Sequence, residues 1–335
     1  MSLSRKSIAT ITPNISGVET IAMIPRDPPP TYQEGKFFYN DVYKTFSFFT
    51  DRPNSSLEIG QEMWLRSLNN TGVDMSDGDV VYISGASGNS PEISLAIADK
   101  KSTSSVIGVL TENIVSGAIG IVTRGGLVHN INTSLCEAGD IVYLSPTTAG
   151  TFTKTKPTGL NSIVRVGVIT HVGVSDGVLL VDPVDYGRAD SPTAEMYHLD
   201  NTVATTINTV NVWERVQKVT QAGILLGFIH NGAGLLTADV TKEDIAGNYD
   251  VSCAISSRIA GTNKTYEYGI AVNGTVVEKT RTVRKFSTSD VGSQNISGII
   301  EVPAGGTVAL RVRNVTDDTD IIVVSVNMNI IKIGA

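Results

Sequence analysis

The last third of the chain alternates apolar and polar residues with a period of two, which is typical of half-buried β-strands. Residues 308–313 place Val, Leu and Val at every second position, between Ala and Arg. Residues 322–330 do the same with Ile322, Val324 and Val326, followed by Met and Ile. Both segments are predicted to be strands, each with one apolar face.

Turn signals join these runs into a larger β-structure. Asn273-Gly274 lies between the runs 266–272 and 275–277, and an Asn-Gly pair in such a place predicts a tight hairpin. Cys253 falls on the inward rhythm of a further run and is expected to be a small core residue. We expect about eight strands in residues 206–335, arranged as a jelly-roll β-sandwich.

A heptapeptide at 78–84 returns at 139–145, with five identical residues and with Ile141 and Leu144 in place of Val80 and Ile83. Each copy is a Gly-Asp turn followed by a short β-branched and aromatic run, the pattern of a strand that leaves a tight turn. The flanking segments 107–111 and 166–170 also match, with Gly second in both. We therefore predict a duplicated small β-barrel or sandwich module of about sixty residues per copy, with copies near 60–122 and 123–183.

The beginning of the chain differs from the rest. Residues 1–33 are rich in Ser, Thr, Asn and Pro and are predicted to form an extended anchoring arm. The aromatic cluster 37–49 follows, and it predicts two strands around an Asn-Asp turn. The apolar side chains of the arm are its candidate contacts with a larger particle, namely Ile8, Ile11, Ile15, Ile21 and Ile24.

These patterns divide the chain into four parts. The arm is followed by the duplicated module at 34–183, a linker at 184–205 and a head domain at 206–335. The linker has no period of its own. Its segment 194–198 fits one helical turn or a strand equally well.

Composition narrows the function classes. Charged residues make up 18% of the chain, below the roughly 25% of an average soluble domain, and Gly, Ser, Thr, Asn and Val are frequent. A net charge of −7 argues against nucleic acid as a partner. Two Cys and four His give no zinc-ligand spacing, so neither a metal nor another cofactor is expected. We also expect no signal peptide and no membrane insertion.

The sequence offers no recognisable catalytic motif, and the chain is expected not to be an enzyme. The four histidines lie in unrelated contexts, and no Gly-x-Ser-x-Gly elbow precedes a helix. The densest acids, Asp317, Asp318 and Asp320, read as a solvated turn between two strands. The alternative for these acids is a calcium-binding loop, because close-spaced oxygen ligands suit that ion.

The chain resembles bacteriophage virion fibre and spike proteins from roughly residue 35 to 335. The residues that carry this resemblance in the first half are 60–62, 70–72, 78–86, Ala96, Ala98, 107–109, 138–140 and 143–145. Those in the second half are 200–207, Trp213, 247–251, 272–274 and the closing strands. The ending looks like the trimeric jelly-roll knobs of the tumour-necrosis-factor-like class, which phages use as fibre heads.

The resemblance implies a homotrimeric structural protein on the virion surface, made in the bacterial host cytoplasm. The arm would anchor a tail or head fibre to other virion proteins, and the head would attach to the host surface, with a cell-surface glycan as one possible partner. The candidate trimer interface is Trp213, Val308, Leu310, Val324 and Val326. The alternatives are a capsid decoration or head-fibre protein that braces the capsid and, ranked third, a glycan depolymerase spike.

Overall fold

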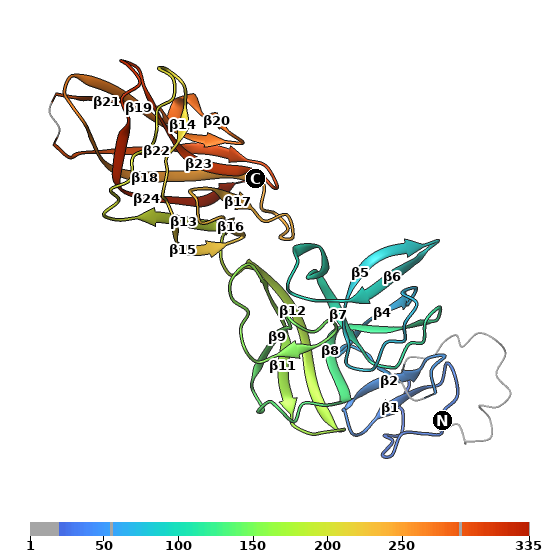
Figure 1. The fold of residues 1–335 in the computed structure, drawn as a ribbon. Coiled ribbons are helices and arrows are strands. Elements are labelled where there is room, and N and C mark those ends of the chain that lie inside the picture. Colours follow the sequence, from blue (N-terminus) through green and yellow to red (C-terminus); the bar gives the residue numbers. More distant parts are fainter. Residues whose placement is uncertain (1–19, 54–55, 288–289, 335) are drawn as a thin grey trace.

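The computed structural model of the protein describes residues 20–53, 56–287 and 290–334. Regular structure in these ranges consists of β-strands and two 3₁₀ helices, η2 (Lys101–Thr103) and η3 (Glu278–Thr280). The predicted all-β fold class is confirmed. Figure 1 shows an elongated molecule, with β1–β12 gathered at one end and β13–β24 at the other.

A small aromatic sheet follows the arm. Its strands are β1 (Phe37–Asn40), β2 (Thr45–Phe49) and β3 (Ser56–Glu58). The predicted aromatic hairpin is therefore confirmed, with β1 and β2 antiparallel. The rings of Phe38 and Phe49 lie 5.0 Å apart, and both side chains are buried. Ring contacts of this kind stabilise a sheet that is too small to bury a large core.

A nine-stranded sheet forms the middle of the described chain, in the order β10-β9-β11-β12-β8-β4-β6-β5-β7. Its strands are β4 (Met63–Leu68), β5 (Val80–Ser87), β6 (Ser90–Leu95), β7 (Val106–Leu110), β8 (Ile119–Ile131), β9 (Ile141–Leu144), β10 (Phe152–Thr153), β11 (Ser162–His171) and β12 (Gly177–Arg188). The first half of β8 pairs with β4 and β7, and its second half pairs with β12. One long strand thus serves both copies of the repeat.

The repeated glycine makes the same backbone bond in both copies. The N–H of Gly78 donates to the carbonyl of Leu110 at 3.0 Å, and the N–H of Gly139 donates to that of Ile169 at 2.7 Å. Both glycines have a positive φ, 87° and 94°. That left-handed conformation is readily adopted by Gly, which explains why this residue occurs twice.

The repeated aspartate closes the same turn. Asp79 Oδ2 accepts the N–H of Ser76 at 2.7 Å, and Asp140 Oδ2 accepts the N–H of Glu137 at 2.8 Å. The aspartate N–H donates back to the carbonyl of the same residue in each copy. A carboxylate that accepts a backbone N–H in this way fixes a turn before a strand.

The flanking glycines of the repeat are also matched in space. A Cβ added to Gly108 would overlap the carbonyl oxygen of Thr123, and one added to Gly167 would overlap that of Leu180. Both positions therefore need Gly because a neighbouring strand passes too close for a side chain. Thr123 and Leu180 are thereby structurally equivalent.

Two apolar clusters support this sheet. One lies within the first copy and consists of Met75, Val81, Ile93, Leu110, Ile114 and Val122. The other joins the copies, because Val80 and Val109 of the first pack in the same cluster as Val142 and Val166 of the second. Adjacent residues Val80 and Val81 are both fully buried, so the beginning of β5 is covered on both faces.

The head is a sandwich of two antiparallel sheets. The first contains β15 (Gln221–Leu226), β13 (Thr193–His198), β24 (Ile321–Gly334), β18 (Gly247–Ile259) and β22 (Gly292–Val302), in that order. The second contains β16 (Phe228–His230), β17 (Leu236–Ala238), β23 (Thr307–Asn314), β19 (Lys264–Val272) and β20 (Thr275–Val276), with β14 (Glu214–Arg215) on β23 and β21 (Thr282–Phe286) on β19. This is the predicted jelly roll, in which the chain crosses repeatedly from one sheet to the other.

Three tyrosines and Cys253 lie in the core between these sheets and are fully buried. Each tyrosine hydroxyl has a partner: Tyr266 donates to Thr319 O at 2.7 Å, Tyr268 bonds Ser257 at 2.6 Å, and Tyr249 donates to Ile245 O. Buried hydroxyls without such partners would destabilise the fold. The placement of Cys253 agrees with its predicted core role.

The predicted Asn-Gly hairpin is also present. Asn273 and Gly274 connect β19 to β20, and their φ angles are 50° and 83°. Two successive positive φ values define the type I′ turn that suits the twist of a two-residue hairpin.

Half of the predicted linker is strand. β12 continues to Arg188 by pairing with β11, and β13 begins at Thr193, so only 189–192 separate them. The open choice for 194–198 is resolved as a strand of the head sheet, with Ala194 and Met196 buried. The absence of a clear period in 184–188 reflects the end of β12, where most side chains are exposed or only partly buried.

The predicted alternation of 322–330 is interrupted. Val323 is buried, Val324 and Ser325 are both only half-buried, and burial resumes at Val326. The pairing with β18 shifts register at this point, which is the effect of a β-bulge. The expectation that Ile322 and Val324 share a face with Val326 is therefore wrong.

Candidate functional site

Three of the predicted trimer-interface residues belong to the core of the head itself. Val308, Leu310 and Val326 are at most 1% exposed and pack in the cluster between the two sheets. They are not accessible to a second copy, and this part of the prediction is corrected. Alternation identifies the buried face of a strand, but it does not say which neighbour buries it.

The other two residues lie nearer the surface. Val324 is half-buried beside the bulge of β24. Trp213 stacks against its own chain, with the guanidinium carbon of Arg313 4.7 Å from the indole centroid and Arg311 donating to its carbonyl at 3.0 Å. Arg313 is held in turn by Glu267 at 2.6 and 2.8 Å. A role for Trp213 or Val324 between copies stays a prediction.

The candidate anchor residues of the arm divide into two groups. Ile8, Ile11 and Ile15 lie outside the described residues. Ile21 and Ile24 are 64% and 62% exposed. Large apolar side chains exposed in this way suit a docking role, which stays a prediction.

The outward side of the sheet β15-β13-β24-β18-β22, called here the outer head face, consists mainly of small uncharged side chains. Cross-strand rows on β22, β18 and β24 join Ser297, Ser252 and Asn329, and then Asn295, Ala254 and Asn327. These six residues are exposed: Ser252, Ala254, Asn295, Ser297, Asn327 and Asn329. Short side chains on three neighbouring strands leave a flat surface.

Hydrogen bonds hold the amides of this face in one arrangement. Asn329 donates to Asn327 Oδ1 at 2.6 Å, and Asn327 donates to Glu195 Oε1 at 2.8 Å. Exposed apolar residues lie toward one end of the same face, with Ile299 and Ile331 in one row with Asp250. The face therefore combines few charges, little relief and an apolar end.

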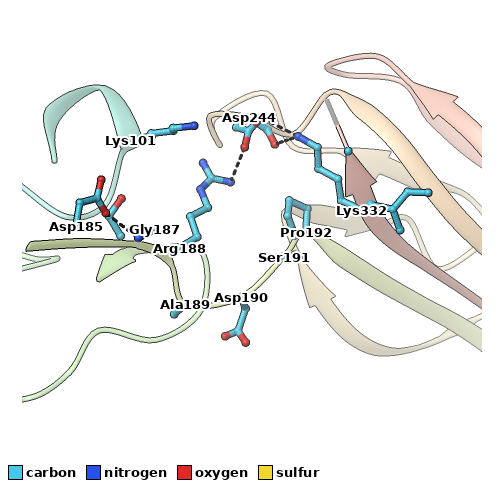
Figure 2. A pocket seen from close by; sticks show the side chains of 13 residues that line it. Lys101, Asp185, Gly187, Arg188, Ala189, Asp190, Ser191, Pro192, Asp244 and Lys332 are labelled. Carbon is cyan, nitrogen blue, oxygen red and sulfur yellow. Dashed lines mark hydrogen bonds and ion pairs between the residues drawn. The ribbon is translucent and has the colours of Figure 1, made fainter. Parts of the chain in front are cut away.

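A polar cluster joins the head to the middle sheet (Figure 2). Lys332 donates to the side chain and the carbonyl of Asp244, both at 2.7 Å, and Arg188 lies 4.0 Å from the other Asp244 oxygen. Arg188 also donates to the carbonyl of Glu243 at 2.6 Å. The carboxylate of Glu243 accepts the hydroxyl of Ser102 at 2.6 Å and the N–H of Ser102 at 3.0 Å. Hydrogen bonding to Lys332 keeps the pKa of Asp244 below its ordinary value.

This junction surrounds a cavity of 530 Å³ with residues from both bodies. Lys101, Asp185 and Arg188 come from the middle sheet and its loops, while Asp244 and Lys332 come from the head. Positive and negative side chains alternate around it, so the cluster holds the head by paired charges and selects neither sign of ligand.

The acidic turn 314–320 is present where it was predicted, between β23 and β24. Asp317 pairs with Lys264 and also accepts Asn314 Nδ2 at 2.8 Å and the N–H of Thr319 at 3.1 Å. The bond to Lys264 is the main cause that lowers the pKa of Asp317 to about 2. Asp320 accepts the N–H of Ile207 at 2.8 Å. Both carboxylates have protein partners.

Neither a metal-ligand cluster nor a membrane-spanning helix is found within the described residues. There, no group of three or more His, Cys, Asp or Glu side chains is placed to hold a metal ion. No helix in the same ranges is long and apolar enough to cross a membrane.

Comparison with known proteins gives partial structural similarity. No family model and no curated protein matches the sequence. Murine APRIL at pH 5.0 is similar with a TM-score of 0.29 and 10% identity, over 42% of this chain and 99% of that chain. PRD1 vertex protein P5 is similar with a TM-score of 0.30 and 11% identity, over 43% and 99%. At these scores neither similarity identifies the function or assembly of this chain.

Proposed function

We propose that the chain is a non-enzymatic structural protein of a bacteriophage virion. In this proposal it forms a homotrimeric fibre at the virion surface, anchored by its N-terminal arm and presenting the jelly-roll head for attachment to the host. The resemblance of its strands and turns to phage fibre proteins supplies the virion setting. Three heads on one stalk would strengthen weak attachment through effective concentration.

The observation that carries the trimer is the composition of the outer head face. Association removes water from polar groups, and unpaired charges make this unfavourable. Ser252, Ala254 and Asn327 carry no charge and lie near the middle of the face. Small side chains also let two surfaces approach closely, and charge depletion is typical of interface centres.

Light scattering coupled to size exclusion tests this assembly. The wild-type chain should have about three times the chain mass of 35.5 kDa. Ala254→Arg places a charge in the centre of the outer head face and should give monomers. Val283→Arg is the matched control, because Val283 is exposed on the opposite sheet, and it should remain trimeric. A monomeric wild type at micromolar concentration would overturn the trimer.

A second arrangement, a capsid decoration or head-fibre protein that braces the capsid, differs in the docking partner of the arm. Ile21 and Ile24 of the arm are exposed, and in this proposal they dock on a tail protein or on a capsid protein. The full chain with both residues changed to Asp should lose binding to purified particles. Binding of the wild type to tail-less capsids would favour the capsid location, and binding only to tailed particles would favour the tail fibre.

Shortening of host polysaccharide by the chain would instead support the third alternative, a depolymerase spike.

A further inference from the structure

A small cavity lies between the aromatic sheet and the repeat, far from the head. It has a volume of 170 Å³ and is called here the acid–aromatic pocket. The residues that matter for its chemistry are Tyr43, Glu58, Glu62, Trp64, Asp77 and His129. The rings of Tyr43 and His129 are 5.5 Å apart, and neither Lys nor Arg occurs among the described residues that line it.

The three acids of the pocket, Glu58, Glu62 and Asp77, differ in their hydrogen bonding and in their pKa values. Glu58 is buried, and its carboxylate accepts hydrogen bonds from the hydroxyl groups of Ser47 and Ser56. Burial raises the pKa of Glu62 to about 7 and that of Asp77 to about 6. Near neutral pH these two carboxyl groups therefore exchange readily between a form that accepts hydrogen bonds and one that also donates them.

Two lining residues carry a buried polar atom that lacks a hydrogen-bond partner within the described residues. These atoms are Trp64 Nε1, a donor, and Asp77 Oδ1, an acceptor. Each such atom destabilises a fold by about 1–3 kcal/mol unless it is satisfied. A ligand that satisfies both must accept one hydrogen bond and donate another. A hydroxyl group does both, whereas an ammonium group only donates.

The second copy of the repeat shows that these side chains are not required for the fold. Trp64 on β4 pairs with Thr123, and Leu127 on β8 pairs with Leu180, the structural equivalent of Thr123. Trp64 therefore corresponds to Leu127. Five residues further on, Asn69 Oδ1 and Asn132 Oδ1 each accept the N–H two residues ahead, which confirms this alignment of the two strands.

The same alignment identifies the counterparts of the two acids. Glu62 corresponds to Gly125, two positions before the Trp64–Leu127 match. Asp77 corresponds to Ala138, because each directly precedes the repeated glycine. The first copy thus carries polar or aromatic side chains where the second has apolar ones or none. Their presence in one copy only points to a role in binding.

We propose that the acid–aromatic pocket binds one neutral sugar residue of a glycan. Aromatic rings pack against the apolar face of such a ring, while its hydroxyl groups bond the carboxyl groups and the indole N–H. The volume is below the roughly 300–1,000 Å³ of pockets for drug-sized ligands, which fits a single six-membered ring. The pocket is complete within one chain and is separate from the head, so it is independent of the proposed trimer.

A printed array of neutral glycans, probed with the full-length chain, tests this site. At least one glycan should bind, and its terminal monosaccharide should give saturation-transfer signals in NMR. Trp64→Leu and Asp77→Ala, which install the residues of the second copy, should each weaken binding at least tenfold. Asp99→Ala, an exposed acid outside the pocket, should leave binding unchanged. Thermal melting and the mass in solution show that each variant is folded and assembled.

Three outcomes would overturn the proposal. They are the absence of binding across the array, sugar binding that survives both pocket substitutions, and displacement of the sugar by methylammonium, which would identify a cation site.

Asp77→Asn keeps the shape of the side chain and removes its charge. Weak but measurable binding by this variant supports direct contact with a hydroxyl group and separates the contact from a folding defect.

Discussion

The two copies of the repeat have the same backbone bonds and different side chains around them. Gly78 and Gly139 donate to equivalent carbonyls, and Asp79 and Asp140 close equivalent turns. Beside these shared residues, the first copy has acids and an indole where the second has Ala, Gly and Leu. Gly and Asp therefore maintain the β unit, while neighbouring positions vary without loss of the fold and can acquire a binding role.

The largest effect should come from the flanking glycines, where both copies have the same steric requirement. Gly108→Val and Gly167→Val would each push a side chain into a carbonyl oxygen of the neighbouring strand. Each should lower the free energy of unfolding of the middle sheet by about 3 kcal/mol, at the upper end of overpacking effects. Urea unfolding followed by Trp64 fluorescence, in a Trp213→Phe background, measures both. A large loss in one copy alone would contradict their equivalence.

The turn glycines should separate the copies. Ala at either position must adopt a positive φ, which destabilises by about 1–2 kcal/mol. At Gly78 the new Cβ would also lie 2.9 Å from Ile131 Cγ2, whereas at Gly139 it meets open space. Gly78→Ala should therefore be the more damaging substitution in the same unfolding measurement. Equal losses would mean that Ile131 moves aside without strain.

Substitution of the turn aspartates should have a smaller effect on stability than substitution of the turn glycines, and the effect should be equal in the two copies. Asp79→Ala and Asp140→Ala each remove one acceptor of a backbone N–H, at 2.7 and 2.8 Å in the native turns. A hydrogen bond of this type contributes about 1 kcal/mol. Urea midpoints should fall by similar amounts, and the corresponding Asn variants, which keep an acceptor oxygen, should recover part of the loss. Recovery in neither copy would show that the carboxylate charge is the important property.

The sequence predicts the parts of this molecule that local patterns determine. The Asn273-Gly274 hairpin follows from backbone preference alone, and the duplicated Gly-Asp turn follows from direct comparison of two segments. Whether Val308 is buried by its own chain or by another copy could not be predicted, because the alternation of apolar and polar residues around it is the same in both cases. The interrupted alternation at Val324 results from a β-bulge, which adds one residue to a strand. No residue type signals the position of such a bulge reliably.

The pocket was not predictable for a different reason. Tyr43, Trp64, Asp77 and His129 come from four separate segments, and no motif spacing connects them. Only the observed pairing of β4 and β8 aligns Trp64 with Leu127 and reveals the contrast between the copies. Of these residues, Asp77 alone carried a signal in the sequence, since its counterpart directly before the second heptapeptide is Ala138.

The last effect, no larger than that of the turn aspartates, concerns Glu62, which is missing from the second copy. Burial raises its pKa from the ordinary 4.5 to about 7, with the nearby Glu58 carboxylate adding to the shift. The folded state therefore holds the proton more tightly than the unfolded state. This contribution to stability is complete below pH 4.5 and is lost as the pH rises through 7. Glu62→Gln keeps the shape and removes the titration.

The variant and the wild type should therefore be equally stable at pH 4.5, and the variant should be more stable at pH 8. We expect a gain of about 1 kcal/mol, less than the full conversion of the pKa shift because the side chain is partly exposed. Urea unfolding at the two pH values measures it, with Asp77 and His129 unchanged in both proteins. A gain at pH 8 that vanishes at pH 4.5 would mean that the first copy retains an acid that weakens its fold, as expected of a residue kept for binding. A variant that is less stable at both pH values would instead assign Glu62 to the scaffold, with Gly125 as a counterpart that lost it.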